Sequence, residues 1–207
     1  MSEPLARSPI RPPEPVVVLS GWEVSGRRAA GQLTLTDCTP LAKVLLRADV
    51  AGVAATQVAV PFGRARRNAG GVLVVGSGPG EWLLLGPPGQ AGQIRAGLDE
   101  LAGAPEPVSV TDVTHGRALI RLTGERAADV LSAVCGIDLS DPVTPDGAAF
   151  RTAVAALATD VVRDDVAGVR SYLLHCERSS GQYLFDALMS AGRDLGIEID
   201  GFQAQGF

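Results

Sequence analysis

Residues 117–136 read RALIRLTGERAADVLSAVCG and contain two different periodicities. Over 117–123, apolar residues alternate with charged ones, which predicts a half-exposed strand. The next segment places four apolar residues at helical spacing: Ala127, Val130, Leu131 and Val134. This pattern predicts an amphipathic helix that ends at Gly136. The stretch therefore predicts a strand followed directly by a helix that covers one face of its sheet.

The sequence after Gly136 continues in the same way. Two further strands are predicted at 150–157 and 169–176, with the acidic region 160–165 beside the turn between them. A last helix is expected to begin at Ser179 or Ser180 and to end before Gly196. The order strand, helix, strand, strand, helix is most of a ferredoxin-like βαββα unit.

The first half predicts further strands joined by turns rich in glycine and proline. These strands are expected at 32–35, 43–47, 71–76, 82–86 and 108–113, with a helix at 90–102 stopped by Gly103 and Pro105. Residues 48–70 have no clear periodicity and fit either a helix or a long loop. The predicted fold class is α+β, with mostly antiparallel sheets and helices on one face.

Three segments are predicted from these patterns. Residues 1–15 form an extended, proline-rich arm that is expected to order against a partner. Residues 16–113 form an N-terminal α+β subdomain, and residues 114–207 form the C-terminal ferredoxin-like subdomain.

Composition excludes several classes of protein. The 207 residues include 18 Lys+Arg and 23 Asp+Glu, for a net charge of −5, which does not favour nucleic-acid binding. Every apolar run is too short to span a membrane, and the start of the chain does not resemble a signal peptide, so a cytoplasmic location is expected. The cysteines Cys38, Cys135 and Cys176 are predicted to be buried, reduced thiols.

Few polar residues suggest chemistry, and no catalytic residue is predicted. Asp112 and His115 are the candidates for cofactor binding, because both lie where a strand leaves its sheet. They fit either ligand or partner contacts or a hydrogen-bonded pair that braces the loop. His175 next to Cys176 is interpreted as a core histidine, because neighbours in a strand point to opposite faces and do not share a metal ion.

One basic cluster stands out in an acidic chain. Arg64, Arg66 and Arg67 are close together, and no aromatic residues interleave with them as nucleic-acid stacking would require. The cluster is interpreted as part of a solvated loop. No metal site is predicted anywhere in the sequence.

Several motifs, in order along the chain, resemble the gamma subunit of heterotetrameric sarcosine oxidase. They are EWLLLG at 81–86, DVTHGR at 112–117, LTG at 122–124, AADVL at 127–131, and Arg178-Ser179 followed by Tyr183-Leu184. That subunit is itself similar to the folate-binding fold of the glycine-cleavage aminomethyltransferase, whose DVSHMG segment resembles residues 112–116. The catalytic carboxylate of the transferase would fall near Asp160, but ATDV at 158–161 departs from the family's GIIDDL-type pattern.

The resemblance implies a complex that oxidatively demethylates sarcosine to glycine, giving 5,10-methylenetetrahydrofolate and hydrogen peroxide. FAD, FMN, NAD and tetrahydrofolate would belong to the complex, with no cofactor expected in this chain. Its partners would be the alpha, beta and delta subunits, and its own role would be mainly structural. Two alternatives stay open: a free-standing folate-binding, aminomethyltransferase-like protein of one-carbon metabolism, and a flavin-free scaffold for another partner.

Overall fold

The computed structural model describes residues 4–99 and 107–204, and its core is two sheets packed face to face. The six-stranded sheet has the order β11 (Ala149–Val154), β12 (Leu157–Arg163), β13 (Ser171–Glu177), β10 (Arg117–Thr123), β4 (Thr34–Asp37), β14 (Glu198–Asp200). The five-stranded sheet has the order β6 (Ala65–Arg67), β7 (Leu73–Gly78), β8 (Glu81–Gly86), β5 (Ala42–Arg47), β9 (Ser109–Asp112). All pairings in these sheets are antiparallel except that of β4 with β14.

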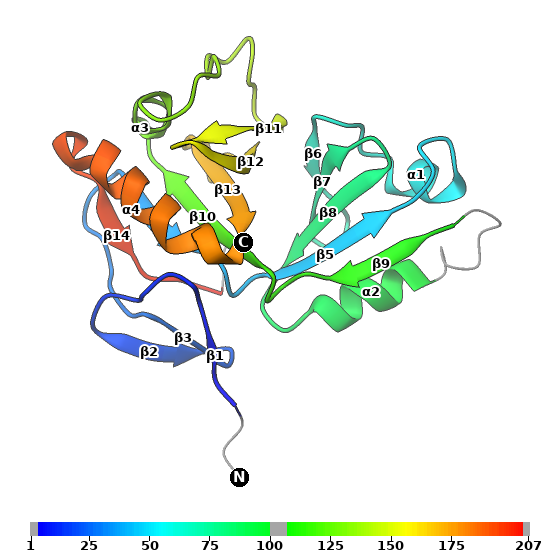
Figure 1. The fold of residues 1–207 in the computed structure, drawn as a ribbon, viewed down its shortest axis with the longest axis horizontal. Coiled ribbons are helices and arrows are strands. Elements are labelled where there is room, and N and C mark those ends of the chain that lie inside the picture. The colour runs from blue at the N-terminus through cyan, green and yellow to red at the C-terminus, as the bar shows by residue number, and fades with distance from the viewer. Residues whose placement is uncertain (1–3, 100–106, 205–207) are drawn as a thin grey trace.

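Helices cover the outer face of each sheet. The helices are α1 (Val53–Val58), α2 (Ala91–Asp99), α3 (Ala127–Ser132) and α4 (Gly181–Ala191), with short 3-10 turns η2 (Arg178–Ser180) and η3 (Arg193–Leu195). Figure 1 shows α3 and α4 on the left, beside the six-stranded sheet, and α1 and α2 on the right, beside the five-stranded sheet. This arrangement confirms the α+β class, with the helices on one face of each mostly antiparallel sheet.

The alternation in β10 explains why one strand serves two packing layers. Ala118, Ile120 and Leu122 are fully buried against α3 and α4, whereas Leu119 is fully buried on the opposite face. Leu119 packs there with Leu173 of β13 and with apolar side chains of β7 and β8. Successive side chains of a strand point to opposite faces, and both faces of β10 are buried. The strand predicted at 117–123 is therefore a central strand and not a half-exposed one.

The five-stranded sheet uses the same alternation. Val44 and Leu46 of β5 pack with Trp82 and Leu84 of β8 beneath α1 and α2. The predicted hairpin around Ser77–Gly80 is confirmed as β7–β8, with a bulge at Gly76/Gly78. Residues 48–70, which had no clear periodicity, contain α1 and β6. The predicted end of the 90–102 helix at Gly103 lies outside the described residues.

The two strands predicted between α3 and α4 are present as β11 and β13, but the prediction missed β12, which lies between them. The chain reverses between β11 and β12 at Ala155 and Ala156, whose φ angles are 48° and 65°. Tight hairpin turns of this kind usually contain glycine or asparagine, so two alanines give no turn signal. Asp160 therefore lies within β12 and not beside a turn.

Three other strands were absent from the sequence prediction. β2 (Val16–Leu19) and β3 (Trp22–Ser25) form a hairpin, and β14 closes the edge of the six-stranded sheet beside β4. Because β4 pairs with β10, this sheet contains residues from both sides of residue 113. The division into subdomains at that residue stays a prediction.

The N-terminal segment contacts its own chain. Residues of β1 (Ala6–Arg7) pair with β3 in parallel, and Ile10 is 1% exposed within the core beneath α4. The sheet of β1, β3 and β2 lies at the lower end of the molecule in Figure 1. In residues 4–15, Ile10 thus already packs on the core of its own chain, whereas Leu5 stays exposed; ordering of the segment against a partner stays a prediction.

The central position of Leu119 gives a test of the sheet-to-sheet contact. Leu119→Ala removes a fully buried side chain from the layer between the sheets, and we expect the free energy of unfolding to fall by about 2–5 kcal/mol. Val143→Ala is the matched control, because Val143 is 57% exposed, and a change within about 0.5 kcal/mol is expected. Urea unfolding of both variants measures the difference, and equal effects would contradict this packing.

Candidate functional site

The turn at residues 112–116 carries the chain from β9 in one sheet to β10 in the other. The Asp112 carboxylate accepts a hydrogen bond from the Thr114 N–H at 2.9 Å. The buried Thr114 hydroxyl oxygen accepts one from the Lys43 N–H at 3.0 Å, and the Val113 N–H donates to the Lys43 carbonyl at 2.9 Å. The turn is thus fixed to the backbone of β5.

The two predicted binding residues lie on this turn and are exposed. The His115 ring stacks on Trp22, with 4.9 Å between ring centroids and 10° between planes. The Asp112 carboxylate accepts its hydrogen bond from Thr114 of the same turn rather than from His115, as a loop-bracing carboxylate would. A role for Asp112 and His115 in ligand or partner binding stays a prediction.

Beneath this turn lies Lys43, which sequence reasoning did not select. It is the only lysine of the chain and is fully buried. Its ammonium group donates to the Thr39 carbonyl at 2.7 Å and to the Leu41 carbonyl at 2.9 Å. Burial lowers the Lys43 pKa to about 7, against the opposing charges of nearby acidic groups. A lone lysine in an apolar strand was the available signal.

Asp37 is a half-buried acidic group whose charge acts on Lys43. Burial raises its pKa, although hydrogen bonds from Ser8 and Thr39 and the charge of Lys43 oppose the shift. The Thr39 N–H donates to its carboxylate at 2.9 Å. Because Lys43 bonds to carbonyl groups and has no exposed surface, it organises the crossing between the sheets and offers no accessible amine.

A second polar constellation lies in a cavity of about 110 Å³ between the sheets. Its charged and ionisable lining residues are Arg47 and Glu81 from the five-stranded sheet, and Arg117, Arg151, Asp160 and His175 from the six-stranded sheet. Arg47 pairs with Glu81 at 2.8 Å, and Arg117 pairs with Glu177 at the rim. Ion pairs therefore span much of the cavity wall.

Asp160 and His175 meet inside this cavity. The Asp160 carboxylate accepts two hydrogen bonds from Arg151, at 2.6 and 3.1 Å, and lies 3.3 Å from His175 Nδ1. Burial raises the Asp160 pKa, but the His175 and Arg151 hydrogen bonds outweigh it and leave the pKa below its usual value. Burial lowers the His175 pKa. Near neutral pH Asp160 is therefore an ionised carboxylate with no proton to donate.

The predicted core position of His175 is confirmed. It is 7% exposed and faces the other sheet, whereas Cys176 faces α4. Its Nε2 atom is buried and has no hydrogen-bond partner within the described chain. All three cysteines are buried and free, as predicted. Residues 4–99 and 107–204 contain no group of three or more His, Cys, Asp or Glu side chains arranged to hold a metal ion.

A larger cavity, of about 310 Å³, lies against the outer strands β4 and β14 of the six-stranded sheet. Thr34, Thr36 and Thr123 line it together with Arg121. The Arg121 guanidinium pairs with Asp164 at 2.7 Å and donates to the Ser171 hydroxyl at 2.8 Å. The Asp164 carboxylate thus compensates the charge of Arg121. The cavity therefore presents threonine hydroxyl groups beside a cation that already has its partner.

With this geometry established, the comparisons identify the family. Residues 72–207 match the GCVT N-terminal domain. The chain belongs to this family. No curated protein matches the sequence significantly.

Two solved structures share the GCVT-domain fold. A chain of heterotetrameric sarcosine oxidase from Corynebacterium sp. U-96, in complex with pyrrole 2-carboxylate, is 23% identical with a TM-score of 0.69, covering 81% of this chain and 88% of that one. Aminomethyltransferase T of the glycine cleavage system from Bartonella henselae is 15% identical with a TM-score of 0.67, covering 90% of this chain and 55% of that one. This chain therefore spans only about half the length of the aminomethyltransferase.

The folate implied by the sequence resemblance does not fit the cavity around Asp160. Cavities that enclose a drug-sized ligand usually measure about 300–1,000 Å³, well above the 110 Å³ around Asp160. Arg151 occupies both oxygens of the carboxylate that a ligand would use. A pterin there would have to displace the Arg151–Asp160 and Arg47–Glu81 ion pairs. We therefore derive no chemical step through folate at this place.

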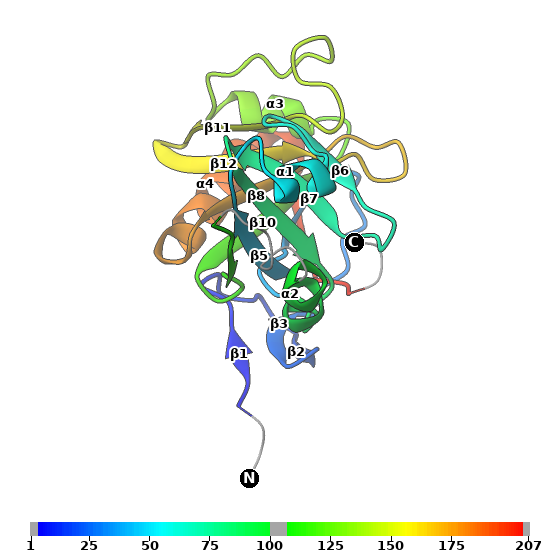
Figure 2. The ribbon, with the colours of Figure 1, turned by 90° about the vertical axis from the view of Figure 1, so that its right-hand side faces the viewer.

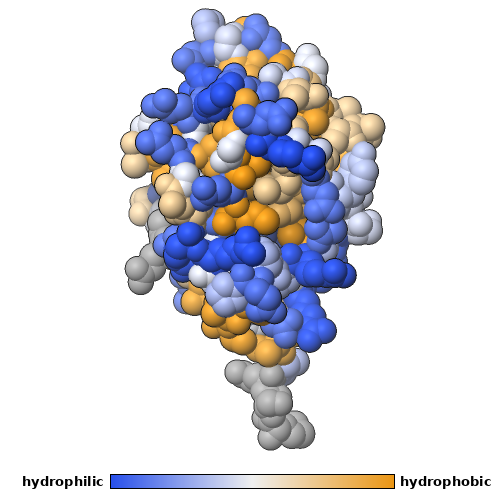
Figure 3. Space-filling model, turned by 90° about the vertical axis from the view of Figure 1, so that its left-hand side faces the viewer, coloured by the Kyte–Doolittle hydropathy of each residue, from blue (hydrophilic) through white to orange (hydrophobic). Residues whose placement is uncertain are grey.

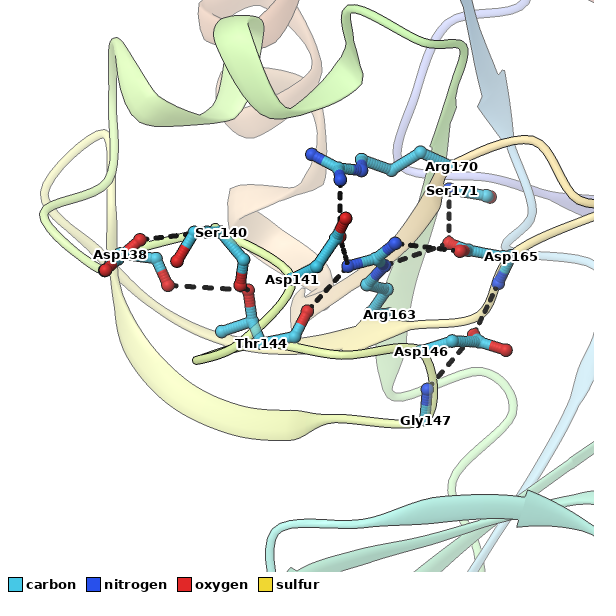
Figure 4. A network of polar contacts seen from close by, with 10 residues as sticks. All are labelled: Asp138, Ser140, Asp141, Thr144, Asp146, Gly147, Arg163, Asp165, Arg170 and Ser171. Atoms are coloured by element: carbon cyan, nitrogen blue, oxygen red, sulfur yellow. Dashed lines mark hydrogen bonds and ion pairs between the residues drawn. The ribbon is translucent and has the colours of Figure 1, made fainter.

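A third polar cluster in the GCVT domain is structural. Figure 4 shows Arg163 reaching from β12 to the loop that follows α3. Arg163 is 6% exposed, bonds to Asp141 and Asp165, and donates to the Thr144 carbonyl at 2.8 Å. Arg170 shares the Asp141 carboxylate. Each charged group has partners of opposite sign, so the cluster fastens the loop to the sheet.

The Lys43 environment predicts a pH-dependent stability. Its folded pKa of about 7 lies below the usual 10.5, so between these values the folded chain binds fewer protons than the unfolded chain. Stability should therefore rise between about pH 7 and 8.5, with a slope of up to about 1.4 kcal/mol per pH unit. In Lys43→Met this slope should disappear. Urea unfolding at several pH values measures it, and equal slopes in both proteins would contradict the assignment.

Proposed function

We propose that this chain is the gamma-type, mainly structural subunit of a heterotetrameric sarcosine oxidase. The observation that carries the proposal is coverage: the fold matches 88% of a chain of the Corynebacterium heterotetramer but only 55% of the aminomethyltransferase. The ordered sequence motifs at 81–86, 112–117 and 127–131 support the same assignment.

The state of the polar groups also supports a structural role. A general acid needs a proton to donate, and a general base needs an accessible lone pair. Asp160 is ionised and its carboxylate oxygens are engaged by Arg151 and His175, whereas Lys43 is buried beneath the 112–116 turn. Under this proposal, FAD, FMN, NAD and tetrahydrofolate act in the alpha, beta and delta subunits, in the cytoplasm, while this chain supplies packing surface.

Exposed apolar residues beside the N-terminal end are consistent with such packing. Leu5, Val16, Val17 and Val18 are between 40% and 57% exposed, and the three valines follow one another in the edge strand β2. Figure 3 shows hydrophobic surface directly beside the N-terminal end of the chain. Contiguous apolar surface on a protein commonly marks an interface. In the described part of the chain, no helix is long and apolar enough to cross a membrane.

Co-expression tests the proposed assembly. We expect the full chain to co-purify with alpha, beta and delta sarcosine oxidase subunits as one complex with fixed stoichiometry, measured by size-exclusion chromatography with light scattering. Expressed alone, it should aggregate more readily than the complex because its interface surface is then exposed. A chain that stays monodisperse and separate from all three subunits would contradict the proposal.

A kinetic test addresses the non-catalytic role. In the assembled oxidase, Asp160→Asn should leave kcat and KM for sarcosine unchanged, whereas removal of a general acid or base costs about 10²–10⁴-fold. Asp186→Asn is a matched control, because Asp186 is an exposed carboxylate on α4. A large loss of kcat in Asp160→Asn alone, with normal assembly, would refute the structural role.

The free-standing folate-binding alternative predicts a different result. Titration of the isolated, folded chain with tetrahydrofolate in a calorimeter should give no saturable heat at high micromolar ligand. Saturable heat that Asp160→Asn abolishes would favour the alternative, because it would place the ligand in the cavity between the sheets.

A further inference from the structure

An apolar hollow of about 420 Å³ opens beside α1, on the outer face of the five-stranded sheet. Its lining includes Val50, Ala59, Val60, Phe62 and the buried Trp82. The Trp82 indole N–H donates to the Val60 carbonyl at 2.8 Å, which fixes the inner wall. Val50 and Phe62 are 62% and 64% exposed, so large apolar side chains meet solvent at the opening. Figure 2 shows this side, with α1 and β6 toward the viewer.

Two arginines without ion pairs lie on the same face of this sheet. Arg66 pairs with Val74 in the β6–β7 register, and Val74 belongs to the core layer under α1 and α2. Because side chains alternate along a strand, Arg64 shares the face of Arg66, whereas Arg67 points the other way and pairs with Asp164. The Arg66 guanidinium donates to the carbonyl of Ala59, a lining residue of the hollow, at 3.3 Å.

The charges around the hollow are positive overall, in a chain whose net charge is −5. Arg64 and Arg66 are exposed and make no ion pair with any described residue. The acidic neighbour is Asp49, next to Val50, and its carboxylate accepts a hydrogen bond from the Ala51 N–H at 2.8 Å. An apolar pocket with an arginine rim is typical of the energetic centre of a protein interface.

We propose that this hollow receives a segment of a partner subunit that carries a bulky apolar side chain next to one or two carboxylates. The apolar side chain fills the hollow between α1 and the β7–β8 turn, and the carboxylates pair with Arg64 and Arg66. This assignment rests on the proposed function, because it names one surface through which the chain joins its oxidase subunits.

A second copy of this chain is a poorer occupant. The exposed loop after α3 carries Val143 with nearby carboxylates, and two of these, Asp141 and Asp146, are already held by Arg163 and by the Gly147 and Asp165 N–H groups. A self-contact through this loop would therefore have to break internal ion pairs or hydrogen bonds to satisfy the arginines. A partner segment with free carboxylates has no such cost.

Two variants test the assignment in the co-expressed complex. Phe62→Asp and Arg66→Glu should each weaken binding to the other subunits at least about tenfold, because they remove the apolar anchor surface and reverse the rim charge. Val143→Asp and Arg193→Glu are the matched controls, since both residues are exposed elsewhere, and they should bind like the natural chain. Thermal unfolding of each isolated variant verifies that it is folded.

A photocrosslinker identifies the occupant directly. Benzoylphenylalanine at position 62 of the natural chain, irradiated in the complex, should capture a peptide of one oxidase subunit. Mass spectrometry should find in that peptide a bulky apolar residue within a few positions of Asp or Glu. Binding of the natural chain should weaken with added salt more steeply than binding of Arg66→Glu.

Each other outcome overturns the assignment in a distinguishable way. If the natural chain does not assemble, the proposed function and this surface both fail. If the chain assembles and Phe62→Asp and Arg66→Glu assemble equally well, only this surface fails. Crosslinks between copies of this chain would replace the partner with a second copy, and flotation with anionic phospholipid vesicles, lost in Arg66→Glu, would replace it with a membrane.

Discussion

The apolar layer between the two sheets is the constraint on which the rest of the structure depends. Leu119 and Leu173 meet Leu83 and Leu85 there, and burial of each such side chain contributes about 1.5–3 kcal/mol. This layer holds β10 against β8. The polar groups of the crossing at 112–116 must therefore find their hydrogen-bond partners at the ends of the strands. Lys43 and Asp37 lie under that crossing, and the Asp160 cavity lies between the same two sheets.

This geometry explains why the cavity between the sheets contains ion pairs and has little room. Side chains of Arg151 and Arg47 extend from opposite sheets toward Asp160 and Glu81, and long arginine side chains fill volume that smaller residues would leave open. Within the GCVT-domain fold of this chain, Asp160 thus belongs to a network of ion pairs that joins the two sheets.

Sequence patterns predicted the central strands and the amphipathic helices, because their apolar periodicity reflects burial directly. The patterns failed where a turn is formed by residues that rarely form one. Ala155 and Ala156 reverse the chain with positive φ angles, which glycine or asparagine usually adopts. The turn at 112–116 was predicted correctly, because the apolar pattern of the strands on either side ends there. Its support by Lys43, and the meeting of Asp160 with His175, depend on register between distant strands, which a single sequence does not encode in any short motif.

The arginines of the chain divide into two groups by their partners. Arg121, Arg151 and Arg163 form ion pairs with carboxylates of neighbouring strands or loops, so their charges are compensated within the fold. Arg66 lies on the short edge strand β6 and Arg64 directly precedes it, and neither makes an ion pair with a described carboxylate. An edge strand presents such side chains to solvent, and charge there also discourages unwanted strand pairing.

Protection of a sheet edge alone does not require an apolar hollow beside the charges. The combination of an uncompensated cation with exposed Phe62 and Val50 is what distinguishes an interaction surface from ordinary protection of a sheet edge.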